Sequence, residues 1–214
     1  MTQGDRGSAG PGFAGVILAD APAPLLPLVA ALGALVSWLQ EVRVPGVIIG
    51  GVATSLLGRP RATRDVDAVL WVEDEGQWAA LVEAGKPHGL LPRIDDVVSF
   101  ARQSRVLLLR HEPSSIDLDV TLGGLPFEQE AIAHAIHVSV ADLRVPLPRP
   151  EDLVIMKAVA HRPRDLADIE GLVAAVPSLD NKYILDWIRD FAEALETPEL
   201  PAEIERLLRP RRRI

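Results

Sequence analysis

The chain has 214 residues, 48% of them hydrophobic, which is enough for one buried core with or without a small helical appendage. This composition excludes disordered and fibrous proteins. The absence of cysteine excludes disulfides, thiolate metal sites and cysteine nucleophiles, and a reducing cytoplasm is the expected compartment. A net charge of −8 argues against a surface that binds nucleic acid everywhere, although local arginine clusters remain possible sites.

The first forty residues hold a polar segment and then an uncharged one. Residues 1–12 are rich in glycine and polar side chains and are expected to be a flexible terminus. Residues 21–40 carry no charge, but Pro22, Pro24 and Pro27 leave an apolar stretch well short of the roughly 20 residues that a membrane span requires. We therefore predict a buried helix from about Pro27 to Val42 and no membrane partner.

The middle of the chain alternates strand and helix patterns. A strand at Val47–Ile49 ends in Gly50 and Gly51 and leads into a helix, and a second strand follows at Asp65–Val72. The pattern then predicts a helix at Gly76–Ala84, an antiparallel hairpin formed by Val106–Leu109 and Ile116–Leu122, a helix at Phe127–Ala135 and a short edge strand at His137–Val140.

From Pro150 onward the sequence predicts helices only, at Glu151–Ala160, Arg164–Val176, Lys182–Leu195 and Ala202–Leu208. The proline-rich stretch before them is the one plausible boundary. The predicted fold is α/β, of the α+β kind: a small mixed or antiparallel sheet flanked by helices, with a C-terminal helical region. The predicted parts are residues 1–12, 13–148 and 149–214.

Two pairs of aspartates carry the chemistry. Asp65 and Asp67 stand two residues apart in a predicted strand, as do Asp117 and Asp119, so each pair projects from one face. Carboxylates held so close repel one another unless a cation lies between them, and oxygen ligands suit Mg²⁺ or Mn²⁺. If the two strands are neighbours, the four side chains converge as two-metal phosphoryl transfer requires.

The glycine turn suits a phosphate. Gly50 and Gly51 have no β-carbon, so backbone N–H groups can approach a polyphosphate closely, and the N-terminus of the next helix adds its dipole. A Gly-Gly pair or an Asp-x-Asp motif alone is weak evidence, since most such pairs are turns or exposed acids. Their combination in this order is a much stronger signal.

The segment from Val47 to Asp67 resembles the first motif of the DNA polymerase β-like nucleotidyltransferases, in which a glycine turn precedes Asp-x-Asp at this spacing. The form Arg61-x-Thr63-x-Asp65-x-Asp67 resembles the AbiEii group, which includes toxins of abortive-infection and toxin–antitoxin systems. The stretch from Pro150 to Ile169 is similar to that group's downstream helical motif.

The resemblance implies roles residue by residue. Gly50 and Gly51 would hold the triphosphate, Asp65 and Asp67 would bind the metals, and Asp119 would be the third carboxylate, with Asp117 as the alternative. The remaining expected nucleotide contacts are Ser55, Arg61, Thr63, Lys157, Arg162 and Asp168, of which Lys157 is also expected to be catalytic. Asp168 would orient Lys157, and Ser55 could instead be a simple helix-surface residue.

The implied activity is transfer of a nucleoside monophosphate from an NTP, with Mg²⁺ or Mn²⁺ as cofactor. The acceptor favoured by the resemblance is RNA, such as a tRNA acceptor end, modified by a toxin that could have a cognate antitoxin protein. Protein or small-molecule acceptors, as in antibiotic-modifying enzymes, are the alternative, and so is a partner-binding module without turnover. The intact aspartates argue against the last.

Overall fold

A computed structural model describes residues 17–18 and 21–209 of the chain. The predicted flexible terminus, residues 1–12, lies outside the described residues, as do Arg211, Arg212 and Arg213 at the other end. The described chain divides into two compact units. Residues 21–56 and 60–149 belong to an α/β unit, and residues 57–59 and 150–209 belong to a helical unit. Mixed sheet and C-terminal helices together confirm the predicted α/β class.

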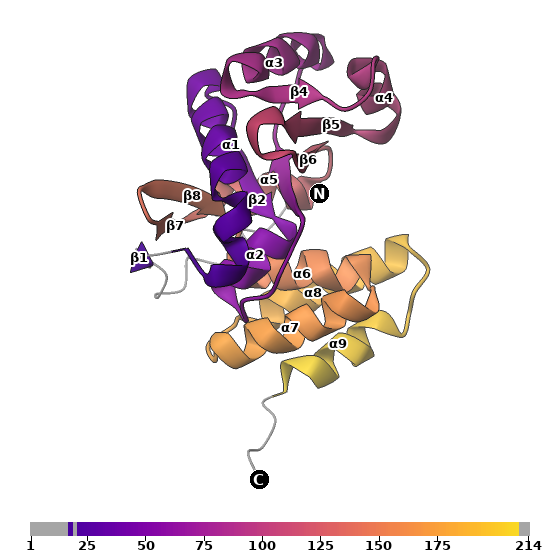
Figure 1. The fold of residues 1–214 in the computed structure, drawn as a ribbon. Helices are drawn as coiled ribbons and strands as arrows, with labels where there is room; N and C mark the ends of the chain where they lie inside the picture. The colour runs from indigo at the N-terminus through magenta and orange to yellow at the C-terminus, as the bar shows by residue number, and fades with distance from the viewer. Residues whose placement is uncertain (1–16, 19–20, 210–214) are drawn as a thin grey trace. The chain divides into compact units, whose positions relative to one another are not determined.

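A five-stranded sheet forms the centre of the α/β unit (Figure 1). Its strand order is β2-β3-β6-β5-β4, and only the central pair β3 and β6 is parallel. The strands are β2 (Gly46–Ile49), β3 (Asp65–Leu70), β4 (Leu90–Pro92), β5 (Val106–His111) and β6 (Ile116–Leu122). Strands β3 and β6 are therefore direct neighbours in the sheet.

Side-chain alternation gives the sheet one apolar and one partly polar face. Every second residue of β3, namely Val66, Ala68 and Leu70, is fully buried, and the matching residues of β6 are buried as well. The opposite face carries the aspartates of both strands, which are half-buried or exposed. Further along that face, Val69 packs with Val47 and Ile132 in a small apolar cluster. The polar residues therefore occupy only one end of the face.

Helices and turns connect these strands. The antiparallel hairpin of β5 and β6 confirms the prediction, and its turn is a short 3₁₀ helix, η4. The sequence pattern did not predict β4, which forms one edge of the sheet, or the helix α4 (Val97–Ser104), which packs against β5. The helical elements of the unit are η1 (Ala23–Leu28), α1 (Val29–Val42), α2 (Gly50–Leu57), η2 (Glu75–Gln77), α3 (Trp78–Gly85), η3 (Lys86–His88), α4 (Val97–Ser104), η4 (Glu112–Ser114) and α5 (Pro126–Ala133).

A second, three-stranded sheet lies in the same unit, with the order β1-β7-β8. Its strands are β1 (Ile17–Leu18), β7 (Ile136–Val140) and β8 (Leu143–Leu147). The prediction of a short edge strand at His137–Val140 was wrong about its position, because β7 pairs on both sides. The sequence does not predict its partner β8, because Pro146 breaks the strand pattern there. A proline is nevertheless tolerated in a strand at the edge of a sheet.

The apolar N-terminal segment forms η1 and then α1. By length and composition the stretch Ala23–Val42 would pass as a membrane span, the only such helix among the described residues. One face of α1 is nevertheless buried in the protein core, and Trp38 there donates a hydrogen bond from Nε1 to the carbonyl oxygen of Leu81 at 3.2 Å. The helix therefore packs as the core helix that the sequence predicts.

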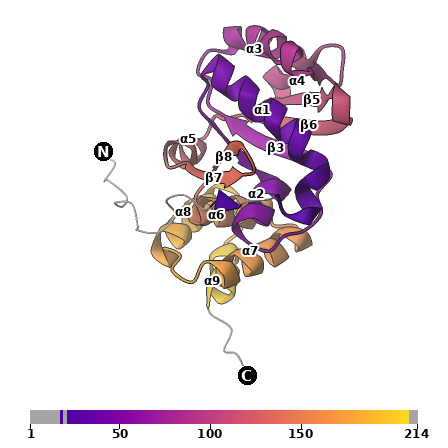
Figure 2. The same cartoon turned by 60° about the vertical axis from the view of Figure 1, so that its left-hand side comes forward.

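Four consecutive helices make up most of the helical unit, as the sequence predicts (Figure 2). They are α6 (Pro150–Ala160), α7 (Pro163–Ala175), α8 (Asn181–Ala194) and α9 (Leu200–Leu208). Helix α6 packs against α7 and α8, and α9 packs against the same two. A buried hydrogen bond of 2.7 Å from the Tyr183 hydroxyl to the Asp152 carboxylate joins α8 to α6.

Candidate nucleotide and metal site

The glycine turn lies directly against one aspartate. Strand β2 pairs with β3 so that Ile49 faces Asp67, and Gly50 follows at once as the first residue of α2. Gly50 has a φ of +61°, and a Cβ there would lie 1.9 Å from Asp67 Oδ2. Only glycine fits both this backbone conformation and this contact. The turn thus places backbone at the carboxylate that the sequence predicts to bind metal.

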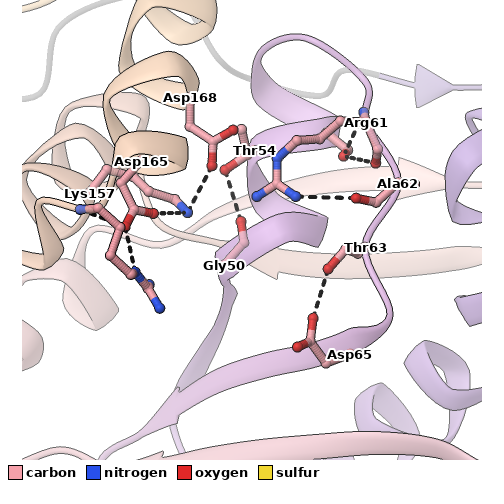
Figure 3. Close-up of polar contacts among 11 residues, drawn as sticks. Gly50, Thr54, Arg61, Ala62, Thr63, Asp65, Lys157, Asp165 and Asp168 are labelled. Atoms are coloured by element: carbon pink, nitrogen blue, oxygen red, sulfur yellow. Dashed lines mark hydrogen bonds and ion pairs between the residues drawn. The ribbon is translucent and has the colours of Figure 1, made fainter.

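The second glycine makes room for Thr63. A Cβ at Gly51 would lie 2.5 Å from Thr63 Oγ1. The Thr63 hydroxyl in turn donates a hydrogen bond of 2.7 Å to Asp65 Oδ1 (Figure 3). Thr63 is half-buried and Asp65 is exposed. The motif residue Thr63 therefore connects the glycine turn to the first aspartate of the strand.

The register of the central pair brings the two Asp-x-Asp motifs side by side. In the parallel pairing of β3 and β6, Asp65 faces Asp117 and Asp67 faces Asp119. Paired residues on neighbouring strands point to the same face, with backbones about 5 Å apart. We call this surface, which carries all four aspartates, the acidic face. The register therefore places the two pairs side by side on one face, as the sequence suggested for neighbouring strands.

Two arginines from the far strands reach the acidic face. Arg110 of β5 pairs with Asp117 in the sheet, and its Nε lies 2.7 Å from Asp117 Oδ1. Arg93 follows β4, and its guanidinium contacts Asp117 Oδ2 at 2.9 Å and Asp119 Oδ1 more closely still. Sequence reasoning missed both arginines. Arg93 could not be found without β4, whose short, proline-ended pattern does not indicate a strand.

The arginines change the electrostatics of Asp117. Its hydrogen bond with Arg110 lowers the pKa of the Asp117 carboxyl below its ordinary value, and the contact with Arg93 adds to this against the opposing effect of burial. The same ion pair raises the pKa of Arg110. Asp117 is thus held in its ionised form, and its negative charge is balanced by the two guanidinium groups beside it.

Ser55 and Arg61 fasten the loop between α2 and β3. Ser55 is buried, not on the helix surface, and its hydroxyl donates to the carbonyl oxygen of Arg61 at 2.9 Å. The N–H of Arg61 donates to the same hydroxyl at 3.2 Å. The Arg61 guanidinium donates to the carbonyl oxygen of Ala62 (Figure 3). A contact of either side chain with nucleotide stays a prediction.

Lys157 lies at the centre of a charged cluster inside the helical unit. Its Nζ is 2.8 Å from Asp165 Oδ1 and 2.9 Å from Asp168 Oδ2, and its side chain is only 8% exposed (Figure 3). Burial opposes ionisation of Asp165, but hydrogen bonds from Lys157 and Arg162 bring its pKa below the ordinary value. Asp168 contacts Lys157 as the resemblance implies, while the nucleotide contacts of Lys157, Arg162 and Asp168 stay predictions.

The acidic face has the donor chemistry that Mg²⁺ requires. Magnesium is commonly bound by one or two carboxylates, with waters and substrate phosphates completing the coordination. Asp65 and Asp67 supply two such oxygen donors next to the glycine turn. In the described part of the chain, no group of three or more histidine, cysteine or acidic side chains is arranged to hold a metal. The fit is therefore to a two-carboxylate site that shares the ion with a phosphate.

Comparison with known families gives a direct result. The family model described as "Nucleotidyltransferase of unknown function (DUF6036)" matches residues 25–190, well over half of the chain. The chain belongs to this family. Comparison of the chain with the curated proteins found none that matches. The match shows a nucleotidyltransferase family, as the sequence predicts, and the finer resemblance to the AbiEii group stays a prediction.

Solved structures resemble the chain over most of its length. The crystal structure of an antigenic nucleotidyltransferase-like protein from Paracoccidioides brasiliensis aligns with a TM-score of 0.56 and 17% identity, over 85% of this chain and 92% of that one. At this identity the likeness shows the fold alone. The solution structure of the antibiotic-resistance factor ANT(2'')-Ia gives a TM-score of 0.48 and 17% identity, over 83% and 96% of the two chains, which is too distant to carry an argument.

Proposed function

We propose that this protein is a metal-dependent enzyme that transfers a nucleoside monophosphate from an NTP to an acceptor hydroxyl. One observation carries the proposal: the turn at Gly50 lies against the carboxylate of Asp67, with Asp65 two residues earlier on the same strand face. A backbone turn suited to phosphate and a carboxylate suited to a metal ion are thus in contact. Transfer of a phosphoryl-type group needs both within reach of one triphosphate.

The reaction has a simple balance. The acceptor oxygen attacks the α-phosphorus, the bond from that phosphorus to the bridging oxygen of the β-phosphate breaks, and pyrophosphate leaves with the electron pair. The proton of the acceptor hydroxyl is lost to a base, for which Asp119, beside Asp67, is our candidate once its ion pair with Arg93 has opened. The backbone N–H groups at Gly50 and Gly51 would hold the triphosphate, so that the α-phosphorus is positioned against the strand.

Asp65 and Asp67 would hold magnesium, which supplies positive charge against the triphosphate and the departing pyrophosphate. Thr63 orients the first of these carboxylates through its hydrogen bond to Asp65. Asp117 is already bound by two arginines and is the weaker candidate for a metal ligand. We therefore assign the third carboxylate to Asp119.

For the acceptor we propose an RNA end, such as that of tRNA, in the setting of a cytoplasmic toxin with a cognate antitoxin. This part rests on the resemblance of the Arg61-x-Thr63-x-Asp65-x-Asp67 motif to the AbiEii group. The net charge of −8 is compatible with a small RNA footprint and disfavours a large one. Protein and small-molecule acceptors are the alternatives that the same assay measures.

The deciding experiment is label transfer. Purified protein is incubated with Mg²⁺ and each of four α-labelled NTPs, in separate reactions with total RNA, with protein lysate and with an aminoglycoside panel. We expect label on RNA, and we expect Asp67→Asn to abolish it. Asp142→Asn, an equivalent change in the exposed turn between β7 and β8, is the matched control and should retain transfer.

The outcomes separate the alternatives. Label on protein or on an aminoglycoside would keep the enzyme and replace the acceptor. Nucleotide binding without transfer to any acceptor would contradict the enzyme and favour a binding module. Transfer that survives Asp67→Asn would remove the acidic face from the mechanism.

A further inference from the structure

Arg93 stands in a row of residues that crosses the sheet. Pro92 pairs with Leu109 at the end of β4, and the N–H of Arg93 continues the ladder by donating to the carbonyl oxygen of Leu108 at 2.9 Å. Leu108 in turn pairs with Asp119, which pairs with Asp67. Arg93 is therefore on the acidic face, two strands from Asp119, and its long side chain reaches across Leu108 to that carboxylate.

The guanidinium of Arg93 is committed to the aspartates. One of its terminal nitrogens contacts Asp117 and the other contacts Asp119, so that a single group bridges the second Asp-x-Asp pair. Its side chain is only 22% exposed, and its Nε is buried without a hydrogen-bond partner among the described residues. Such a fork fits carboxylates far better than a lysine ammonium would, because its donors lie in one rigid plane.

The two aspartates of the pair differ in what else holds them. Asp117 also has Arg110, at 2.7 Å, whereas Arg93 is the arginine that contacts Asp119 in the described part of the chain. If the ion pairs of Arg93 open, Arg110 still balances the charge of Asp117, whereas Asp119 becomes an unbalanced negative charge beside Asp67. A cation that binds at Asp65 and Asp67 would then gain a third carboxylate.

We propose that Arg93 is a positioning residue that competes with a metal ion for Asp119. While the ion pair holds, Asp119 is neutralised and the metal is bound by Asp65 and Asp67. When the ion pair opens, Asp119 joins the metal ligands. The inference deepens the proposed function, on whose metal site it rests, and it names the residue that controls the third carboxylate.

The test measures metal binding, not activity. Mn²⁺ is titrated into the full chain, and free Mn²⁺ is followed by electron paramagnetic resonance in about 0.15 M salt, where remote charges are screened. We expect Arg93→Gln to raise the Mn²⁺ affinity by about tenfold, because the change removes the cation that competes for Asp119. Partners of metal ligands commonly alter metal affinity by about this factor, although their loss usually lowers it. Arg110→Gln is the matched control, because it makes the same charge change beside Asp117 and leaves Arg93 in place; its affinity should stay near the wild-type value.

A double-mutant cycle shows whether the gain in Mn²⁺ affinity depends on the carboxylate of Asp119. Asp119→Asn alone should change the affinity little, whereas Asp119→Asn combined with Arg93→Gln should return it to the wild-type value. The proposal is overturned if Arg93→Gln and Arg110→Gln raise the affinity equally, if Arg93→Gln has no effect, or if its gain survives Asp119→Asn.

A second variant guards against a failure to fold. Arg93→Lys keeps the positive charge but cannot bridge two carboxylates, so it should give a smaller gain that also disappears with Asp119→Asn. Failure of the proposed function is recognised separately. If the wild type transfers no label to any acceptor while the Mn²⁺ cycle behaves as expected, the activity is wrong and the competition stands. If transfer occurs and the cycle shows no coupling, only the competition is wrong.

Discussion

The α-carbon of Gly50 faces the carboxylate of Asp67 with no room for a side chain between them. The contact follows from the register of β2 on β3, in which Ile49 pairs with Asp67 and the chain turns immediately afterwards. The two halves of the motif are therefore in direct contact, and a side chain at position 50 would displace the carboxylate.

Gly50→Ala should lower both stability and transfer. The left-handed backbone at Gly50 costs an alanine about 1–2 kcal/mol, and the new methyl group would displace Asp67. Urea unfolding and label transfer measure the two effects. Gly33→Ala in α1 is the matched control, because its Cβ would meet Leu143 at an ordinary 3.5 Å, and it should be neutral or stabilising. Equal effects at both positions would contradict the explanation.

Thr63 should act through its hydroxyl and not through its shape. Thr63→Val keeps the volume and removes the hydrogen bond to Asp65, so transfer and Mn²⁺ affinity should each fall by about tenfold. Thr63→Ser keeps the donor and should retain most of both. A valine variant as active as the serine variant would show that the hydroxyl does not orient Asp65.

Lys157 should be important for stability. Lys157→Met removes the buried ammonium group that contacts both Asp165 and Asp168, and breaking a buried ion pair costs about 3–5 kcal/mol. Arg162→Ala removes a second partner of Asp165 whose own side chain is 65% exposed, so it should cost at most about 1 kcal/mol. Chemical unfolding of both variants gives the two losses in the free energy of unfolding. Similar losses would mean that burial of the cation does not determine how much its ion pairs stabilise the protein.

Acid should remove the stabilisation that Asp117 provides. Its carboxyl has a pKa lowered from the ordinary value of 3.8 by Arg110 and Arg93, so its contribution to the free energy of unfolding is complete above pH 3.8 and is lost as the pH falls through the lower folded value. The difference in stability between wild type and Asp117→Asn should therefore shrink below pH 3.8. In Arg110→Gln, the stabilisation by Asp117 should be lost at a higher pH than in the wild type. A stability difference between wild type and Asp117→Asn that does not depend on pH would exclude the ion pair as its source.

Much of the fold could be predicted because its signals are local. Apolar periodicity and proline positions predicted the C-terminal helices to within about two residues. Strand β4 and helix α4 were missed, since three residues ending in Pro92 carry no alternation and α4 follows two exposed aspartates. The sequence predicts β7 as an edge strand, because Pro146 breaks the strand pattern of its partner β8.

For the candidate site, the sequence predicted the ligands and missed their partners. Spacing alone places Asp65 and Asp67 on one face, and the glycine motif indicates where a phosphate would lie. Arg93 reaches Asp119 across strand β5, and nothing in the residues around Arg93 indicates which strand it meets. Contacts of this kind depend on strand order, which one sequence does not reveal.

The parallel pairing of β3 and β6 also determines when the acidic face can exist. Between Leu70 and Ile116 the chain contains α3, β4, α4 and β5, so β6 is synthesised after all of them. In a nascent chain, Asp65 and Asp67 therefore emerge from the ribosome well before Asp117 and Asp119 can lie beside them. A chain that has not been synthesised as far as β6 has no acidic face.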